Sequence, residues 1–114
     1  ELYNNPDSLF VAGFIGSPKM NFITGAEAAK HKAHTIGIRP EHIEIAAGAG
    51  AWTGKIALAE HLGADSFLHV DAGPAGRLVV RAPGDFRGKD GDGISLKPDL
   101  NRLHRFDENG KVIR

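Results

Sequence analysis

The chain has 114 residues, enough for one small domain or two very small lobes. Its 14 Lys and Arg residues balance its 14 Asp and Glu residues, so no net charge attracts nucleic acid or an anionic membrane surface. Cysteine is absent, which excludes disulfides and thiolate chemistry, and no apolar run approaches the roughly 18 residues of a membrane-spanning helix.

The N-terminal segment has the pattern expected at the end of a preceding domain. The chain begins at Glu1 without a Met, and we expect it to be a piece of a longer polypeptide. Residues 5–15 predict a capped helical turn or a short helix, because a Pro stands where a helix begins. Residues 20–23 predict a short strand, and Thr24 with Glu27 has the spacing of a capping box ahead of a second short helix.

From His34 onward the pattern changes to short β-like runs separated by turns. Glycine is abundant, at 15 residues, and most of it lies between these runs. Pro40 ends the first run because it removes a hydrogen-bond donor from the strand ladder. The runs predicted as strands are residues 35–39, 43–45, 52–62, 66–70, 77–82, 94–96, 103–106 and 111–113.

The longest run, residues 52–62, alternates with period two, which is typical of a half-buried strand. This alternation places Ile56, Leu58 and Leu62 on one face. The run forms a predicted hairpin with the strand that follows it, and the last two runs of the chain predict a terminal hairpin. Short strands with turns every dozen residues or so predict a small antiparallel barrel or sandwich.

The stretch from Gly48 to Ile56 looks at first like a phosphate-binding loop. Such a loop needs Gly, four residues, then Gly-Lys and a Ser or Thr that holds magnesium. Here Gly48 lies six positions before Gly54 and Gly50 only four, and Ile56 occupies the hydroxyl position. The motif should also open a helix, whereas this one opens a strand. We therefore predict a small-residue turn that leads into the long strand.

Two groups of residues invite a metal interpretation, and neither fits. Residues 90–93 (Asp-Gly-Asp-Gly) lack the further oxygen ligands and the Glu of a calcium loop, so they predict a turn. His31 and His34 could share a helix face with Glu27, as ligands of one divalent ion must. The flanking lysines would repel a cation and no second ligand pair has a recognisable spacing, so a solvated helix face is favoured.

No catalytic constellation is recognisable in the sequence. Ser, His and carboxylate residues are present, but the Gly-x-Ser-x-Gly sequence of a hydrolase nucleophile is not. Small five-stranded barrels often bind oligonucleotides by aromatic stacking over a basic groove. Only 7% of the residues are aromatic, and no predicted strand interleaves them with basic residues. A single-strand nucleic-acid-binding OB domain is therefore a minor alternative.

Several stretches together resemble a known family. Residues 1–6 and 10–22 resemble the passage at which the ATP-binding subunits of carbohydrate-importing ABC transporters leave their nucleotide-binding domain. Residues 37–42 (Gly-Ile-Arg-Pro-Glu-His) resemble the hallmark strand and turn of the C-terminal domain in the maltose and glycerol-3-phosphate importer type. Residues 60–65 and 103–110 fall where that family has similar segments.

The resemblance implies a C-terminal transport-associated OB (TOBE) regulatory domain. The implied fold is all-β and mainly antiparallel, an OB-like small barrel with a short N-terminal helix left over from the ATPase domain. Residues 1–19 would be the end of the nucleotide-binding domain with its linker, and residues 20–114 the regulatory domain. The segment 23–36 is shorter than in many family members, so the first barrel strands are expected to be shortened or replaced by the helix at Thr24.

The resemblance also implies a function. The chain would be a non-catalytic regulatory and dimerisation domain, without catalytic, cofactor-binding or metal-binding residues, in an ATP-binding subunit that imports a sugar, glycerol phosphate or polyol. The ATP and Mg²⁺ sites, with the Walker and signature motifs, would lie in an upstream domain. The implied partners are a second copy, the chain's own nucleotide-binding domain, the membrane subunits and, in some members, a regulatory protein. The implied location is cytoplasmic, at the inner face of the bacterial cell membrane.

The candidate contact residues are those of the hallmark motif: Gly37, Arg39, Pro40, Glu41 and His42. They can be interpreted as scaffold, because Pro40 fixes a turn, Gly37 permits close backbone approach, and Arg39 can pair with Glu41 at the surface. They can also be read as a subunit or domain contact, and the two roles are compatible. The alternative function is a small-ligand sensor for an oxyanion or sugar. Related barrels in oxyanion importers bind their anion at a dimer seam, and backbone N–H groups at glycine-rich turns could do the same here.

Overall fold

The chain divides into two compact units in the computed structural model, which describes residues 19–48 and 50–114. One unit joins the described residues up to Arg39 with Leu100–Arg114, and the other is Pro40–Asp99. The expected N-terminal helix lies outside the described residues. Both units are built mainly of antiparallel strands, which confirms the predicted all-β class.

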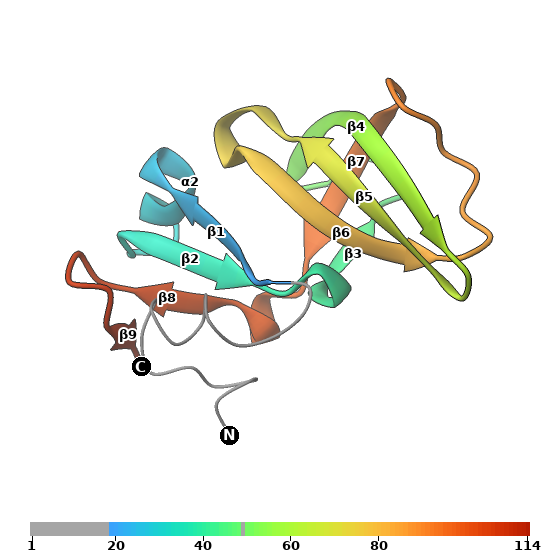
Figure 1. Ribbon diagram of the computed structural model, residues 1–114. Coiled ribbons are helices and arrows are strands. Elements are labelled where there is room, and N and C mark those ends of the chain that lie inside the picture. The colour runs from blue at the N-terminus through green and yellow to red at the C-terminus, as the bar shows by residue number, and fades with distance from the viewer. Residues whose placement is uncertain (1–18, 49) are drawn as a thin grey trace. The chain divides into compact units, whose positions relative to one another are not determined.

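The first unit contains a four-stranded antiparallel sheet (Figure 1). A short helix, α2 (Gly25–Ala29), follows its first strand, and a 3-10 turn, η3 (Leu100–Arg102), precedes the third. The strands in spatial order are β1 (Asn21–Thr24), β2 (Thr35–Ile38), β8 (His104–Phe106) and β9 (Val112–Ile113). The pairing of β8 with β9 confirms the predicted terminal hairpin.

The shortened segment of this unit holds both elements that were expected there. Strand β1 has four residues and helix α2 has five. Thr24 is the N-cap residue of α2, but its side chain makes no capping hydrogen bond. The capping-box interpretation is therefore wrong on this point, although the helix itself is present.

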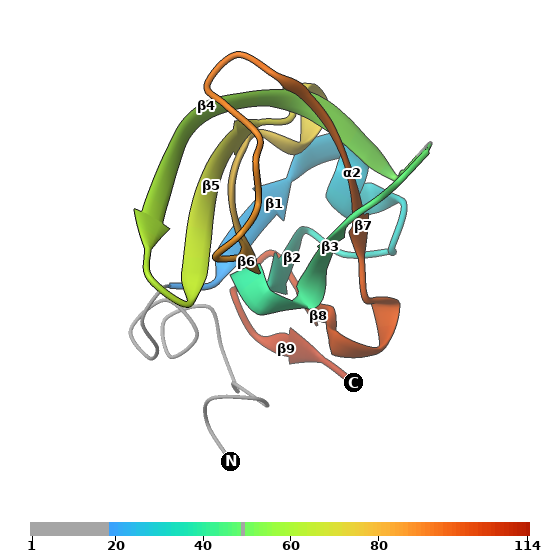
Figure 2. The ribbon, with the colours of Figure 1, turned by 90° about the vertical axis from the view of Figure 1, so that its right-hand side faces the viewer.

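The second unit is a five-stranded antiparallel sheet that curls toward a barrel (Figures 1 and 2). Its strands in spatial order are β3 (Ile43–Ile45), β7 (Gly93–Pro98), β4 (Trp52–Leu62), β5 (Asp65–Asp71) and β6 (Arg77–Pro83). The 3-10 turns η1 (Pro40–His42) and η2 (Gly73–Ala75) precede β3 and β6. Edge strand β6 contacts both the other edge strand, β3, and η1, so the barrel is nearly closed.

Alternate residues of β5, β6 and β7 fill the interior of this barrel. Every second side chain is buried, as in a sheet with one face against a core and one toward water. The buried positions are Ser66, Leu68, Val70, Leu78, Val80, Ala82, Ile94, Leu96 and Pro98. All but Ser66 are apolar, and burying each of the larger ones stabilises the fold by about 1.5–3 kcal/mol.

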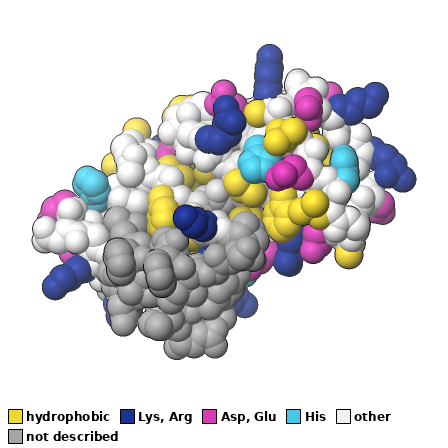
Figure 3. Space-filling view, viewed as in Figure 1, with side chains coloured by type: hydrophobic (Ala, Val, Ile, Leu, Met, Phe, Trp, Pro, Cys, Tyr) yellow, Lys and Arg dark blue, Asp and Glu magenta, His cyan; other side chains and the backbone are white. Residues whose placement is uncertain are grey.

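Strand β4 departs from the predicted alternation. Its pairing with β5 shifts register between Ile56 and Leu58, where Ala57 is the extra residue of a β-bulge. A one-residue shift moves the side chains that follow to the opposite face. Ile56 is 2% exposed, whereas Leu58 is 46% and Leu62 is 62% exposed. The prediction that these three residues share one face is therefore wrong, and Figure 3 shows hydrophobic side chains at the surface over this part of the molecule.

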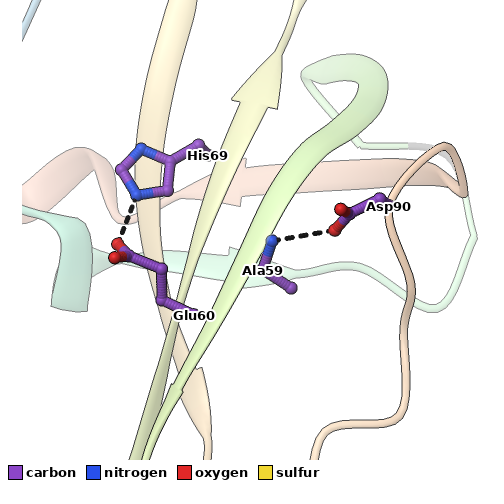
Figure 4. A network of polar contacts seen from close by, with 4 residues as sticks. All are labelled: Ala59, Glu60, His69 and Asp90. Atoms are coloured by element: carbon purple, nitrogen blue, oxygen red, sulfur yellow. Dashed lines mark hydrogen bonds and ion pairs between the residues drawn. The ribbon is translucent and has the colours of Figure 1, made fainter.

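A loop from a distant part of the sequence secures the bulge. The N–H of Ile56 donates to the carbonyl oxygen of Asp92 at 2.9 Å, and the N–H of Gly91 donates to the carbonyl oxygen of Ile56 at 2.6 Å. The N–H of Ala59 donates to Oδ1 of Asp90 at 3.0 Å (Figure 4). The segment that resembled a calcium loop is thus a turn, as predicted. It lies just before β7 and continues the hydrogen bonding of β4 beyond the Lys55–Gly93 pair, where β7 begins.

Candidate interaction surface

Gly37 of the hallmark motif is a packing position. It lies in β2, opposite Phe22 of β1 and His104 of β8. A Cβ atom at Gly37 would come within 2.5 Å of Met20 Sδ and 3.2 Å of Phe106 Cε2. Glycine therefore lets these two buried side chains pack against the sheet. The close approach predicted at Gly37 is present, and the approaching groups are side chains.

The other candidate contact residues differ in exposure. Arg39 is 1% exposed, so the expectation that it lies at the surface is wrong, and Pro40 is buried too. Glu41 and His42 are half-buried. The carbonyl oxygen of His42 accepts a hydrogen bond from the N–H of Asp99 at 2.9 Å, which fixes the backbone of η1. A subunit contact through the motif stays a prediction, and Glu41 and His42 are its partly exposed members.

The outward-facing side chains of β4, β5 and β6 form a second surface. Strand pairing arranges them in three rows across the sheet. The rows are Leu58, His69 and Val79; Glu60, Phe67 and Arg81; and Leu62, Asp65 and Pro83. We call these nine residues the outer sheet face. None of these residues is buried, and the outer sheet face combines apolar residues with charges of both signs.

One ion pair lies on the outer sheet face (Figure 4). His69 Nε2 and Glu60 Oε1 are 2.7 Å apart, and their side chains are 30% and 47% exposed. The pair has full charge on both partners only when His69 is protonated. Exposed pairs of this kind contribute about 0–1 kcal/mol to stability, so the main effect is to hold the two side chains on this face.

The outer sheet face was not predicted from the sequence. Its clearest signal is the pair Leu58 and Leu62, two large apolar residues on one long strand. Strict period-two counting assigned both to the interior, because the bulge at Ala57 depends on hydrogen bonds that Ala59 and Ile56 donate to Asp90 and Asp92, which no local pattern reveals.

A separate hollow in the second unit has a basic lining. Its volume is about 350 Å³, and the ionisable side chains around it are His61, Arg87 and Lys89. The Oγ atom of fully buried Ser66 lies 2.9 Å from Nδ1 of His61, which orients the imidazole ring and leaves Nε2 for another partner. Among the described residues no carboxylate lines this hollow, so its chemistry suits an anion.

The residues that invited a metal interpretation do not form a metal site. Glu27 instead pairs with Lys30 at 2.9 Å beside helix α2. Within residues 19–48 and 50–114, no group of three or more His, Cys, Asp or Glu side chains could hold a metal ion. In the same ranges no helix is long and apolar enough to cross a membrane.

Comparison with known proteins agrees with the motif resemblance. The family model described as the TOBE domain matches residues 36–106. The chain is 38% identical to an sn-glycerol-3-phosphate import ATP-binding protein of Ruegeria pomeroyi, over 99% of this chain and 37% of that protein. It is 29% identical to a maltose/maltodextrin import ATP-binding protein of Vibrio cholerae, over 100% of this chain and 38% of that protein. It is also 29% identical to a lactose transport ATP-binding protein of Rhizobium radiobacter, over 99% of this chain and 39% of that protein. The chain thus spans less than two fifths of the length of these relatives.

Proposed function

Because the chain belongs to the TOBE domain family, we propose that it is the regulatory and dimerisation domain of an ATP-binding subunit in an ABC-type importer. The observation that carries the proposal is its likeness, over nearly its whole length, to proteins named for the import of glycerol phosphate, maltodextrin and lactose. The transported substrate in this proposal is a sugar, a glycerol phosphate or a polyol.

In this proposal the chain itself breaks no bond. ATP and Mg²⁺ would bind an upstream domain that carries the Walker and signature motifs, and the parent subunit would couple ATP hydrolysis to import. Gly54, one of the glycines that resembled a phosphate-binding loop, supports a structural role for that segment. It lies within β4, where it packs closely against the backbone of Asp71 and Ala72.

A dimerising domain is useful in a transporter whose two catalytic domains separate in every cycle of ATP hydrolysis. A persistent contact elsewhere keeps the two halves at an effective concentration of about millimolar, so re-association costs less entropy. The subunit would work in the cytoplasm at the inner face of the bacterial membrane. Its partners would be a second copy, its own nucleotide-binding domain, the membrane subunits and, in some systems, a regulatory protein.

Complementation tests the proposed function. A chimera would carry this chain in place of the aligned region of the Ruegeria pomeroyi glycerol-3-phosphate import protein. We expect it to restore glycerol-3-phosphate uptake in cells that lack the native subunit, because substrate choice would rest on other subunits. The same protein with the aligned region deleted is the control and should restore little uptake. A folded chimera that hydrolyses ATP but is as inactive in uptake as the deletion would contradict the proposal.

The basic hollow favours a second candidate function, the sensing of an anion. Its ionisable side chains, His61, Arg87 and Lys89, are those that bind phosphate-type oxygens. Titration calorimetry with inorganic phosphate, sn-glycerol 3-phosphate and maltose tests it. Saturable binding of the two phosphate compounds, lost in Lys89→Glu, supports the sensor. No binding heat from any of the three compounds contradicts it.

A further inference from the structure

The bulge in β4 leaves two large apolar side chains in water. Leu58 is 46% and Leu62 is 62% exposed, and both lie on the outer sheet face beside half-buried Phe67 and Val79. Removing such side chains from water is favourable, and large exposed apolar side chains gathered on one sheet face are typical of a protein contact surface. The outer sheet face therefore has the composition of an interface rather than of an ordinary solvated sheet.

The residues of this face are arranged symmetrically about β5. In the middle row, Glu60 on β4 and Arg81 on β6 lie on opposite sides of Phe67. In the neighbouring rows, an apolar residue of β4 lies across β5 from an apolar residue of β6. These two apolar pairs are Leu58 with Val79 and Leu62 with Pro83. Each row thus carries on β4 a residue that complements the one on β6.

We propose that the outer sheet face binds the same face of a second copy of this chain, about a two-fold axis that runs along β5. The inference rests on the proposed dimerisation function and names its surface. An axis along β5 places β4 of one copy over β6 of the other at the same row, and every such contact occurs twice. Glu60 then meets the Arg81 side chain of the second copy, and the apolar pairs meet in the same way. The residues of β5, namely Phe67, His69 and Asp65, each face their own equivalent, with the two Asp65 carboxylates at the end of the contact.

Within one copy, Glu60 and Arg81 are held apart. Neighbouring strands are about 4.8 Å apart, so residues on either side of β5 are separated by about 10 Å, with Phe67 between them. Glu60 instead pairs with His69 on the same face, where Glu60 Oε1 lies 2.7 Å from His69 Nε2. Between two copies packed face to face, the Glu60 and Arg81 side chains can meet directly, and the apolar residues of β4 and β6 in the rows on either side help to exclude water from the contact.

Charged residues bound the surface at its ends. Lys55, Asp71 and Arg77 form the next row beyond Leu58, and all three are exposed. At the opposite end, Asp65 lies beside the turn at Gly63. Two twisted sheets packed face to face touch along their middle and diverge at their corners, so the row of Lys55, Asp71 and Arg77 stays close to solvent.

Mixing two charge-reversed variants tests the pairing. Arg81→Glu puts acidic side chains opposite each other in the homodimer, and Glu60→Arg puts basic side chains opposite each other. Each variant alone should therefore raise the dissociation constant of the dimer at least about tenfold. A heterodimer of the two variants regains an attractive contact at both positions. An equimolar mixture should thus recover most of the wild-type affinity, which no effect within a single copy can produce.

Sedimentation velocity of the 114-residue chain over a concentration series gives the dissociation constants, and circular dichroism shows that each variant is folded. Arg102→Glu and Glu108→Arg make the same changes at exposed residues outside the outer sheet face. These matched controls should leave the dissociation constant within about twofold of the wild type. Leu62→Ser is a second probe, which should weaken the dimer by removing exposed apolar surface from the contact.

Failure of this inference and failure of the proposed dimerisation give different results. A wild-type dimer that every outer-sheet-face variant leaves intact overturns the inference and keeps the dimerisation function. Variants that weaken the dimer singly but do not recover on mixing overturn the two-fold pairing. A wild-type chain that stays monomeric throughout the series contradicts both.

Discussion

Gly54 lies where strand β4 passes closest to the end of β5. A Cβ atom at this position would overlap the carbonyl oxygen of Asp71 and come within 2.8 Å of Ala72 Cα. Both neighbours belong to the backbone, so a side chain cannot be accommodated by a rotamer change. The glycine that made this segment look like a phosphate-binding loop is therefore required by the packing of the barrel.

Substitution of Gly54 should be costly. We expect Gly54→Ala to lower the free energy of unfolding by about 2 kcal/mol or more, because the backbone of β5 must move to admit the methyl group. Urea denaturation measures the change. Gly48→Ala is the matched control, because a Cβ atom at Gly48 meets nothing within 4 Å, and its effect should stay within about 0.5 kcal/mol. Equal losses in the two variants would contradict the steric explanation.

Single residues could be predicted where one residue type has one dominant physical role. Pro40 was predicted to end a strand, and β2 ends at Ile38 with Pro40 opening η1. Gly37 was predicted at a close approach, and Met20 supplies it. Arg39 was expected at the surface and is buried, because the burial of a charged side chain depends on tertiary packing rather than on its neighbours in sequence.

Among the elements, the barrel strands form where the alternation predicts them. The residues predicted to face the interior are wrong for one strand, β4. Alternation is a local signal, so it located β5, β6 and β7 and their hairpin partners. The bulge in β4 is fixed by contacts such as that between Ala59 and Asp90, which lie 31 residues apart. A count along the strand cannot register such a contact, and the outer sheet face was missed for that reason.

The loop that holds the bulge gives a prediction for Asp90. Asp90→Ala removes the acceptor for the Ala59 N–H and should lower the free energy of unfolding by about 1 kcal/mol. Asp90→Asn retains an oxygen acceptor of similar geometry and should cost less than half as much. Urea denaturation gives both values, and hydrogen exchange at Ala59 should accelerate only in the Ala variant. If the two substitutions were equally destabilising, the role of Asp90 would lie in its charge and not in this hydrogen bond.

At the scale of the whole molecule, the charges cancel. The chain has 14 basic and 14 acidic residues, so long-range attraction contributes little to self-association. The proposed dimer instead depends on local apolar contacts and on two symmetry-related Glu60–Arg81 pairs. The family was predictable at this scale because residues 37–42 and the flanking segments resemble it, whereas the spacing of strands and turns left both barrel and sandwich open.

This balance predicts a weak dependence of the dimer on salt. Raising the ionic strength from about 0.05 M to about 0.5 M screens the ion pairs but leaves the apolar contacts intact. The dissociation constant measured by sedimentation velocity should therefore rise only a few-fold. Complete loss of the dimer at the higher ionic strength would mean that charge alone holds the two copies together.

If this chain holds two copies of itself together, its mass in solution must depend on its concentration. Sedimentation equilibrium of the unmodified chain, from about 1 μM to about 100 μM, spans the affinities expected of a domain contact of this kind. Self-association of the chain predicts a mean mass that rises with concentration toward twice the 12.1 kDa of one chain. A mass that stays at 12.1 kDa over the whole range would contradict it.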